Sequence, residues 1–285
     1  MKIIKKLLFP FFAIALVISC TKDDSSDIET NSVDERLLVY NQESGGGYLQ
    51  ELNLETGEVI SEIYIGEVSF KGNSYFKKTN EIFAGENNKT VRIDVDSGIS
   101  EIFLDGFGLN VISNISNKFY EFGQPIGDMA IYDVHEWDLL TGVHTFISEL
   151  YFYDGSTDVV ILESTNELIY PTPNSGLYKF NLNTYETTQI NSTNYKNICV
   201  SQELAKAYSS YYNGIENKLV EINLETGVET FISNELNPFI KSVFVESTKE
   251  IVYTDYSGDL FKVNVETGEA SQLSSDHFHA LFIID

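Results

Sequence analysis

Cysteine, proline and tryptophan are all scarce in this chain of 285 residues, which has two Cys, five Pro and one Trp. Two cysteines, Cys20 and Cys199, are too few for the dense disulfide framework that holds small secreted domains together. Cys199 lies in the apolar segment 197–200, so we interpret it as a small buried hydrophobic residue rather than as a nucleophile. With so little proline and only 19 glycines, the chain is neither collagen-like nor of low complexity.

Positive charge is scarce as well. The chain has 18 Lys and Arg against 43 Asp and Glu, a net charge of −25. Such a surface repels nucleic acid and anionic lipid, so no nucleic acid is expected as a partner and the folded part should have no membrane affinity of its own. We interpret the acidic surface as a solubilising one, with specific cation binding as the alternative.

The longest apolar run, residues 7–18, is too short to span a bilayer comfortably. Lys2, Lys5 and Lys6 precede it and polar residues follow it, which is the pattern of a cleaved signal. The run ends in Leu16-Val-Ile-Ser-Cys20, which resembles a bacterial lipobox. The resemblance implies a lipoprotein signal peptide at residues 1–19 and an acylated, palmitate-bearing Cys20. The alternative is an ordinary signal peptide with an incidental cysteine.

Residues 20–34 are polar and acidic, and we predict that they form a flexible tether. A lysine followed by two aspartates just after Cys20 resembles the surface-export signal of some Gram-negative lipoproteins. This implies a lipid-anchored protein of the outer membrane that faces the cell surface. Cleavage before Cys20 would remove three lysines and no acidic residue, taking the net charge to −28. Attachment would therefore depend on several acyl chains at Cys20, since one chain binds only marginally.

The remaining sequence is organised by a phrase that occurs six times. The copies are Asn53-Leu-Glu-Thr-Gly57, Asp94-Val-Asp-Ser-Gly98, Asp138-Leu-Leu-Thr-Gly142, Asn181-Leu-Asn-Thr-Tyr185, Asn223-Leu-Glu-Thr-Gly227 and Asn264-Val-Glu-Thr-Gly268. Their Thr or Ser residues are 41, 44, 43, 42 and 41 residues apart. A period of this length with strand-like content is typical of a β-propeller blade of four antiparallel strands.

The ends of the repeated region predict how the ring closes. The first repeat, beginning at residue 36, has three strands and lacks an innermost one, whereas the last is followed by a lone apolar strand, residues 278–284. We predict that this final strand is the innermost strand of the first blade, which leaves no open sheet edge. The predicted fold is all-β, a six-bladed propeller over residues 35–285.

The repeated phrase resembles the V-x-D-x-x-T-G step of YVTN and quinoprotein-like propellers, and the resemblance spans residues 36–285. It implies the fold and no particular activity. Quinoprotein blades usually carry a tryptophan a few residues after the glycine. Those positions hold Ile60, Phe103, Phe146 and Phe231 here, which argues against a quinone cofactor, and the single Trp argues against a WD-repeat protein. No cofactor is predicted, with a divalent cation as the alternative.

In a repeat protein, a residue found in every blade is architectural and one that breaks the symmetry is a candidate for function. Glu163 and Glu246 resemble a carboxylate pair, but both begin a Glu-Ser-Thr turn, so we interpret them as turn residues. His277 and His279 would lie on one face of the final strand, near the axial channel, and two imidazoles are a minimal start for a transition-metal site. The alternative is that one histidine is exposed and the other packed, near the seam where the ring closes, with no metal bound.

Variable loops on a rigid scaffold are where binding residues concentrate. The segments that enter each blade and those between its second and third strands emerge on one side of the ring, and they are rich in aromatic residues. The candidate ligand-binding residues are Tyr151, Tyr153, Tyr195, Tyr211, Tyr212 and Tyr256. Such rings suit stacking on a sugar or holding a peptide. The alternative is that some of them pack inward.

These features predict a surface-tethered binding or scaffold propeller that is not an enzyme, and that recognises a glycan or a partner outer-membrane protein. The alternative is a metal-dependent enzyme, similar to a lactonase or lyase, with its site in the central channel. No Gly-x-Ser-x-Gly elbow, zinc-ligand motif or phosphate loop occurs in the sequence.

Overall fold

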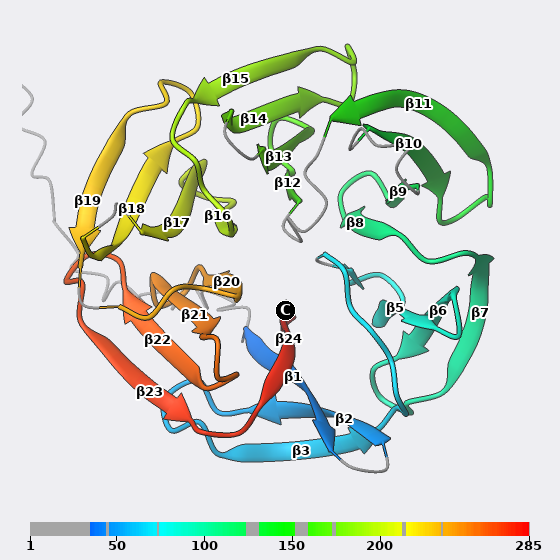
Figure 1. The fold of residues 1–285 in the computed structure, drawn as a ribbon. Helices are drawn as coiled ribbons and strands as arrows, with labels where there is room; N and C mark the ends of the chain where they lie inside the picture. Colours follow the sequence, from blue (N-terminus) through cyan, green and yellow to red (C-terminus); the bar gives the residue numbers. More distant parts are fainter. Residues whose placement is uncertain are drawn as a thin grey trace, which may run out of the picture. The chain divides into compact units, whose positions relative to one another are not determined.

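The computed structural model describes residues 35–43, 46–72, 74–123, 131–151, 159–172, 175–212, 215–234 and 236–284. The described strands belong to one compact unit, Val33–Asp285. They form six sheets of four antiparallel strands, arranged as blades in a ring (Figure 1). The predicted six-bladed all-β fold is confirmed. No helix long and apolar enough to cross a membrane occurs among the described residues.

Each blade runs from an innermost strand A to an outermost strand D, and the following lists keep that order. Blade 1 comprises β24 (Phe278–Ile284), β1 (Arg36–Glu43), β2 (Gly46–Leu52) and β3 (Val59–Tyr64). Blade 2 comprises β4 (Tyr75–Phe76), β5 (Glu81–Glu86), β6 (Lys89–Asp94) and β7 (Ser100–Asp105). Blade 3 comprises β8 (Leu109–Ser113), β9 (Lys118–Phe122), β10 (Ile131–Asp138) and β11 (His144–Tyr151).

The second half of the ring repeats the arrangement. Blade 4 comprises β12 (Val160–Leu162), β13 (Glu167–Thr172), β14 (Gly176–Asn181) and β15 (Thr187–Asn191). Blade 5 comprises β16 (Ile198–Ser201), β17 (Lys206–Tyr212), β18 (Asn217–Asn223) and β19 (Glu229–Ser233). Blade 6 comprises β20 (Lys241–Val245), β21 (Glu250–Thr254), β22 (Leu260–Asn264) and β23 (Ala270–Ser274).

The last strand closes the ring as the sequence predicted. β24 pairs with β1 in antiparallel register, with Arg36 opposite Ile284 and Leu38 opposite Phe282. Figure 1 shows β24, in red, lying beside the blue β1 near the centre of the ring. Because the first and last strands share one sheet, blade 1 is complete only when both ends of the repeated region have folded.

The hydrophobic core is divided among the six interfaces between neighbouring blades, each with its own cluster of buried side chains. Inner strands are apolar on both faces, and every residue of β16 is buried. Outer strands face solvent, and five of the six residues of β3 are exposed. Blades therefore associate through their broad faces, as expected for side chains that alternate across each strand.

The repeated phrase forms the turn between strands C and D. Its opening Asn or Asp accepts hydrogen bonds from the backbone two and three residues later, as Asn53 Oδ1 does from Glu55 N and Thr56 N, both at 2.9 Å. Asn181 and Asn264 make the same pair of bonds. The side chain thus satisfies turn amides that the sheet leaves unpaired, which explains why the repeat keeps Asn or Asp there.

Strand direction alternates within a blade, so the connections fall on two opposite sides of the ring. We call one side the turn face, which carries the A–B turns 77–80, 114–117, 163–166, 202–205 and 246–249 together with the C–D turns. We call the other the loop face, which carries B–C loops such as 255–259 and the segments that lead into strands A, among them 65–72, 106–108, 192–197, 236–240 and 275–277.

Candidate functional site

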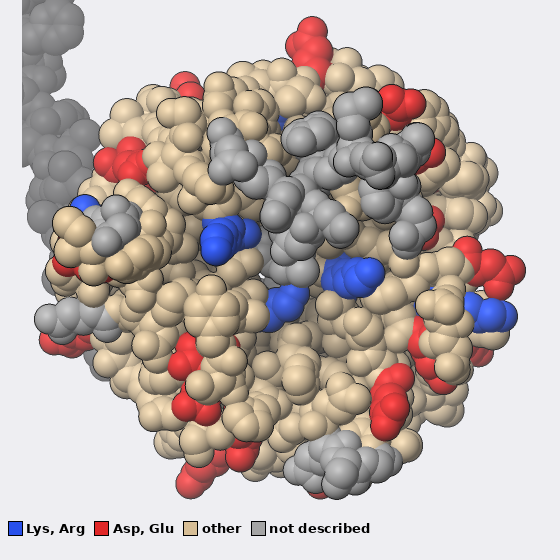
Figure 2. Space-filling view, in the orientation of Figure 1, with Lys and Arg blue, Asp and Glu red and all other residues tan. Residues whose placement is uncertain are grey.

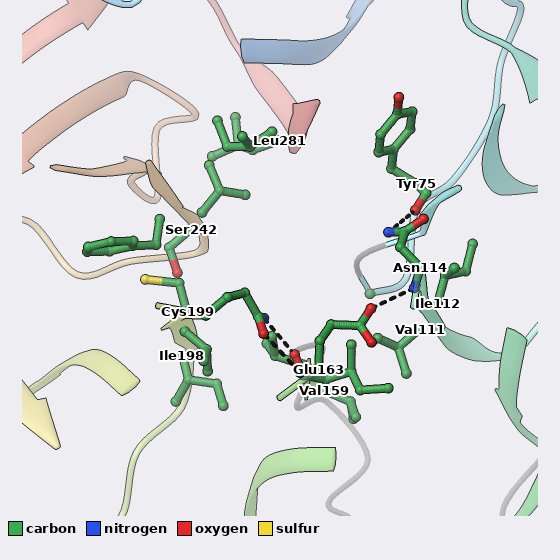
Figure 3. A pocket seen from close by; sticks show the side chains of 18 of the residues that line it. Tyr75, Val111, Ile112, Asn114, Val159, Glu163, Ile198, Cys199, Ser242 and Leu281 are labelled. Carbon is green, nitrogen blue, oxygen red and sulfur yellow. Dashed lines mark hydrogen bonds between the residues drawn. The ribbon is translucent and has the colours of Figure 1, made fainter. Parts of the chain in front are cut away.

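A central channel of about 510 Å³ runs between the inner strands of the six blades. Its wall is apolar over most of its length, formed by Val111, Ile112, Val159, Ile161, Ile198, Val200, Val243 and Leu281 among others. Figure 3 shows labelled members of this wall around the open space, among them Val111, Ile198 and Leu281, with Cys199 and Ser242 on one side. The volume lies within the range of small-ligand sites.

The end of the channel at the turn face is lined by polar residues from the A–B turns. Glu163 accepts hydrogen bonds from Ser113 Oγ and Asn114 N of the neighbouring blade, both at 2.6 Å. Glu246 likewise accepts from Ser201 Oγ at 2.9 Å and Gln202 N at 2.5 Å. The interpretation of these two glutamates as turn residues is confirmed, since their carboxylates are bound to backbone and hydroxyl donors of the adjacent blade.

The same contact recurs around the ring. Asn114 Oδ1 accepts from Lys77 N at 2.8 Å, Gln202 Oε1 from Glu163 N at 2.9 Å, and Glu35 from Glu246 N and Ser247 N at 3.0 and 2.7 Å. Each A–B turn therefore donates its first backbone amide to a side chain of the next blade. We call this set, formed by Glu35, Asn114, Glu163, Gln202 and Glu246, the turn clasp. Lys77 occupies the equivalent position in blade 2, where the series of acceptors ends.

The end of the channel at the loop face has the opposite charge. Lys241, the first residue of β20, lines the channel, and Lys71 lies between the lining residues Phe70 and Gly72. Lys196 precedes the lining residue Ile198 by two positions. Figure 2 shows a face of the molecule on which basic side chains stand at three places around the centre of the ring, with acidic side chains farther out. The channel thus has a basic mouth on an otherwise acidic protein.

Two of the predicted ligand-binding tyrosines are engaged within the fold. Tyr195 is only 2% exposed, and its hydroxyl donates to Glu229 Oε1 at 2.5 Å. Tyr211 packs edge-on against Tyr195, with ring centroids 5.8 Å apart, and its hydroxyl lies 3.5 Å from Glu229 Oε2. Burial and the adjacent Glu229 carboxylate raise the pKa of both phenols. The prediction that the Tyr195 ring is available to a ligand is wrong. The ring is buried, and its hydroxyl is bonded to Glu229 on β19.

Two other predicted tyrosines do lie on the surface. Tyr212, at the end of β17, is 65% exposed, and Tyr256, in the B–C loop of blade 6, is 72% exposed. They belong to neighbouring blades and both lie on the loop face. Tyr151 ends β11, but its side chain is outside what the structure describes, and Tyr153 also lies outside the described residues. The loop face therefore presents two free aromatic rings among the described candidates.

The histidine pair lies at the loop face as well. His277 precedes β24 and His279 is its second residue, and both are exposed on either side of the buried Phe278. His279 lies near Tyr40, with ring centroids 6.4 Å apart. No group of three or more His, Cys, Asp or Glu side chains suited to a metal ion occurs among the described residues. The two imidazoles thus lie on the loop face, without a third ligand from the described part of the chain.

The two cysteines have separate places. Cys199 is 3% exposed and lies in the channel wall, which confirms its burial. Cys20 and the predicted signal peptide and tether lie outside the described residues. The sequence analysis missed Lys71, Lys196 and Lys241. The sequence does place each of them five or six residues before the first residue of its A–B turn. This shared position indicates a common site only once the ring is known to close.

Comparison with known proteins finds similarity in fold. No protein-family model and no curated protein sequence matches the chain. TolB from Acinetobacter baumannii superposes with a TM-score of 0.66 at 11% identity, over 88% of this chain and only 65% of TolB. A chain of a nidogen–laminin complex gives 0.67 at 8% identity, over 88% of this chain and 98% of that one. An oligogalacturonate lyase in complex with manganese gives 0.60 at 13%, over 84% and 73%. At these identities the similarity shows the β-propeller fold alone.

Proposed function

We propose that this chain is a membrane-tethered, non-catalytic propeller that binds a glycan through its loop face. The observation that carries the proposal is the pair of exposed tyrosines, Tyr212 and Tyr256, on neighbouring blades of that face. An aromatic ring with a polar hydroxyl can stack on the apolar face of a sugar while bonding its hydroxyl groups. The fold neighbours include a protein of a nidogen–laminin complex and an oligogalacturonate lyase, so both binding and catalytic proteins use this ring.

Binding is favoured over catalysis by the chemistry of the channel. The three carboxylates that line it, those of Glu35, Glu163 and Glu246, are all held by hydrogen bonds of the turn clasp. A general acid or a metal ligand needs a side chain free to exchange protons or to coordinate.

A metal-dependent enzyme would instead have to use His277 and His279. In that case EDTA would lower the midpoint of thermal unfolding, and one added divalent cation would restore it. We expect no such shift.

The test of glycan binding uses the full chain in a non-ionic detergent on a glycan array, followed by calorimetry with the glycans that bind. Tyr212→Ala and Tyr256→Ala should each weaken binding by about tenfold, as loss of an anchoring aromatic residue usually costs more than 1 kcal/mol. Tyr185→Ala is the matched control, because Tyr185 is 51% exposed but lies in a C–D turn of the turn face. Undiminished binding by both loop-face variants would contradict the proposal, as would capture of a protein partner with no glycan bound.

The proposed anchor has its own test. Cys20→Ser should release the protein from the membrane fraction of the cells that make it, because acylation would then have no thiol to use. Cys199→Ser, which changes the buried thiol, should leave the protein in the membrane fraction. Digestion of intact cells with an added protease would show whether the propeller faces outward. Membrane retention of the Cys20 variant would contradict lipid anchoring at this residue.

A further inference from the structure

Basic side chains of strands B and C are mostly neutralised by carboxylates. Lys206 lies 2.7 Å from Glu221, Lys118 lies 2.8 Å from Glu136, and Lys179 and Lys262 also pair with a glutamate. Lys71, Lys196 and Lys241 differ, since none of them has a carboxylate of the described residues within ion-pair distance. In a protein with a net charge of −25, three uncompensated lysines at one place are a departure that the fold does not require.

The ring places these three lysines at corresponding points of blades 2, 5 and 6. Lys71 and Lys196 precede an inner strand and Lys241 begins one, all at the loop face, so all three side chains start beside the mouth of the channel. Figure 2 shows basic side chains gathered around the centre of the ring. Lys71 is further ordered by Phe107, whose ring centroid lies 5.1 Å from the lysine Nζ. His277 and His279 of blade 1, the blade between 6 and 2, add two imidazoles to the same side.

The channel below the mouth limits what can enter. Apolar side chains line its middle, and its far end carries three carboxylates, those of Glu35, Glu163 and Glu246, against the single ammonium of Lys77. An anion would lose hydration in the middle without gaining partners, and would be repelled farther in. Ser242, next to Lys241, lines the channel and its buried Oγ has no hydrogen-bond partner in the described part of the structure. The arrangement therefore suits a negatively charged group that binds at the mouth, beside Lys241 and Ser242, and does not enter the channel.

We propose that the mouth of the channel binds the carboxylate groups of an acidic oligosaccharide, through Lys71, Lys196 and Lys241. This proposal rests on the proposed glycan-binding function and names the chemical class of its ligand. Lysines on three separate blades match several charges spaced along a chain of sugar acids better than they match one compact phosphate. The exposed Tyr212 and Tyr256 lie farther along the same face, where neutral faces of the same chain could stack. A local basic mouth on an acidic protein also selects this ligand by repelling anions elsewhere.

The test compares acidic and neutral glycans on the same protein. The full chain in non-ionic detergent is applied to an array of neutral and carboxylate-bearing oligosaccharides, and each acidic glycan that binds is then titrated beside its methyl ester, which keeps the sugars and removes the charge. We expect only acidic glycans to bind, with the ester at least tenfold weaker. Lys71→Gln, Lys196→Gln and Lys241→Gln should each raise the dissociation constant about tenfold, the usual range for a charged hydrogen bond.

Lys78→Gln is the matched control. Lys78 is exposed and has no ion pair with the described residues, but it lies in an A–B turn of the turn face. Its substitution removes the same charge and should leave the dissociation constant unchanged. Equal loss from Lys78→Gln and Lys241→Gln would overturn the proposal in favour of general charge attraction. Neutral glycans or methyl esters that bind as tightly would overturn it while leaving the proposed function intact, and an array with no bound glycan would overturn both.

Discussion

At the scale of single residues, the glycine that ends five of the six repeated phrases meets two requirements. Gly227 has a φ of +70°, which L side chains rarely adopt, and a Cβ there would clash with the carbonyl oxygen of Ile190 in the preceding blade. Gly142 has a φ of +71° with open space around it. Tyr185 replaces the glycine in blade 4 and still has a φ of +60°. The positive φ is therefore shared by Gly227, Gly142 and Tyr185. The close contact with the preceding blade is present at Gly227 and absent at Gly142.

This difference predicts unequal costs for one substitution. Gly142→Ala should destabilise the protein by about 1–2 kcal/mol, the cost of a left-handed conformation with a Cβ. Gly227→Ala has the same cost and must also move the blade 4 backbone away, so it should lose at least 1 kcal/mol more. Urea unfolding of both variants measures the difference. Equal stabilities would mean that blades 4 and 5 are not in close contact at this turn.

Glu121 provides a test of pH dependence. Burial raises the pKa of its carboxyl, while the nearby His135 and His144 act in the opposite direction. The folded state then binds a proton more readily than the unfolded state, so stability is lost as pH rises from the ordinary carboxyl pKa through the raised one. Glu121→Gln should be more stable than the natural protein at pH 7.5, and this advantage should shrink at pH 4. Urea unfolding of the natural protein and the variant at both pH values measures this difference in stability. Glu225→Gln, on an exposed C–D turn, removes the same charge and is the control.

Residue roles were only partly predictable. The Asn or Asp that opens each repeated phrase could be assigned from sequence because its partners are only two and three residues away, as for Asn53. Tyr195 could not, because the acceptor of its hydroxyl, Glu229, is 34 residues away and lies on another strand. A tyrosine ring can stack on a ligand or pack in an interface between blades equally well. Only its tertiary contacts decide which of the two it does.

At the scale of strands and turns, the turn clasp links neighbouring blades beyond their hydrophobic packing. Gln202 has two partners in blade 4, accepting from Glu163 N at 2.9 Å and donating to Ile161 O at 2.7 Å. Gln202→Ala should therefore cost about 2 kcal/mol, near 1 kcal/mol for each bond. The midpoint of thermal unfolding should fall by roughly 2–4 °C per kcal/mol.

A matched substitution tests whether the loss comes from the clasp. Gln272→Ala removes the same side chain from the exposed outer strand β23, where its hydrogen bonds are 3.4 Å long. This variant should keep the unfolding midpoint of the natural protein within about 1–2 °C, as expected for a surface change. If both variants behave alike, the contacts of Gln202 contribute nothing beyond those of an exposed side chain.

At the scale of the whole molecule, the ring was predictable and the site was not. The six phrases each specify a local turn, and their period repeats one blade, so local signals add up to the global fold. The basic mouth arises differently. Lys71 and Lys241 are 170 residues apart in sequence and share one opening only because six blades close into a circle. No local sequence pattern specifies that these two lysines lie at the same opening.

Closure of the ring depends on β24, and Phe282 is the residue that tests it. Phe282 is 1% exposed, and its ring centroid lies 5.2 Å from that of Phe70, in the cluster between blades 1 and 2. Phe282→Ala should cost about 3–5 kcal/mol, the usual range for a buried aromatic residue. Phe231→Ala, on the outer strand β19 and 56% exposed, should change stability by about 0.5 kcal/mol or less. Because β24 completes the only blade built from both ends of the repeated region, a loss below about 1 kcal/mol in Phe282→Ala would mean that the ring is not closed by this strand in solution.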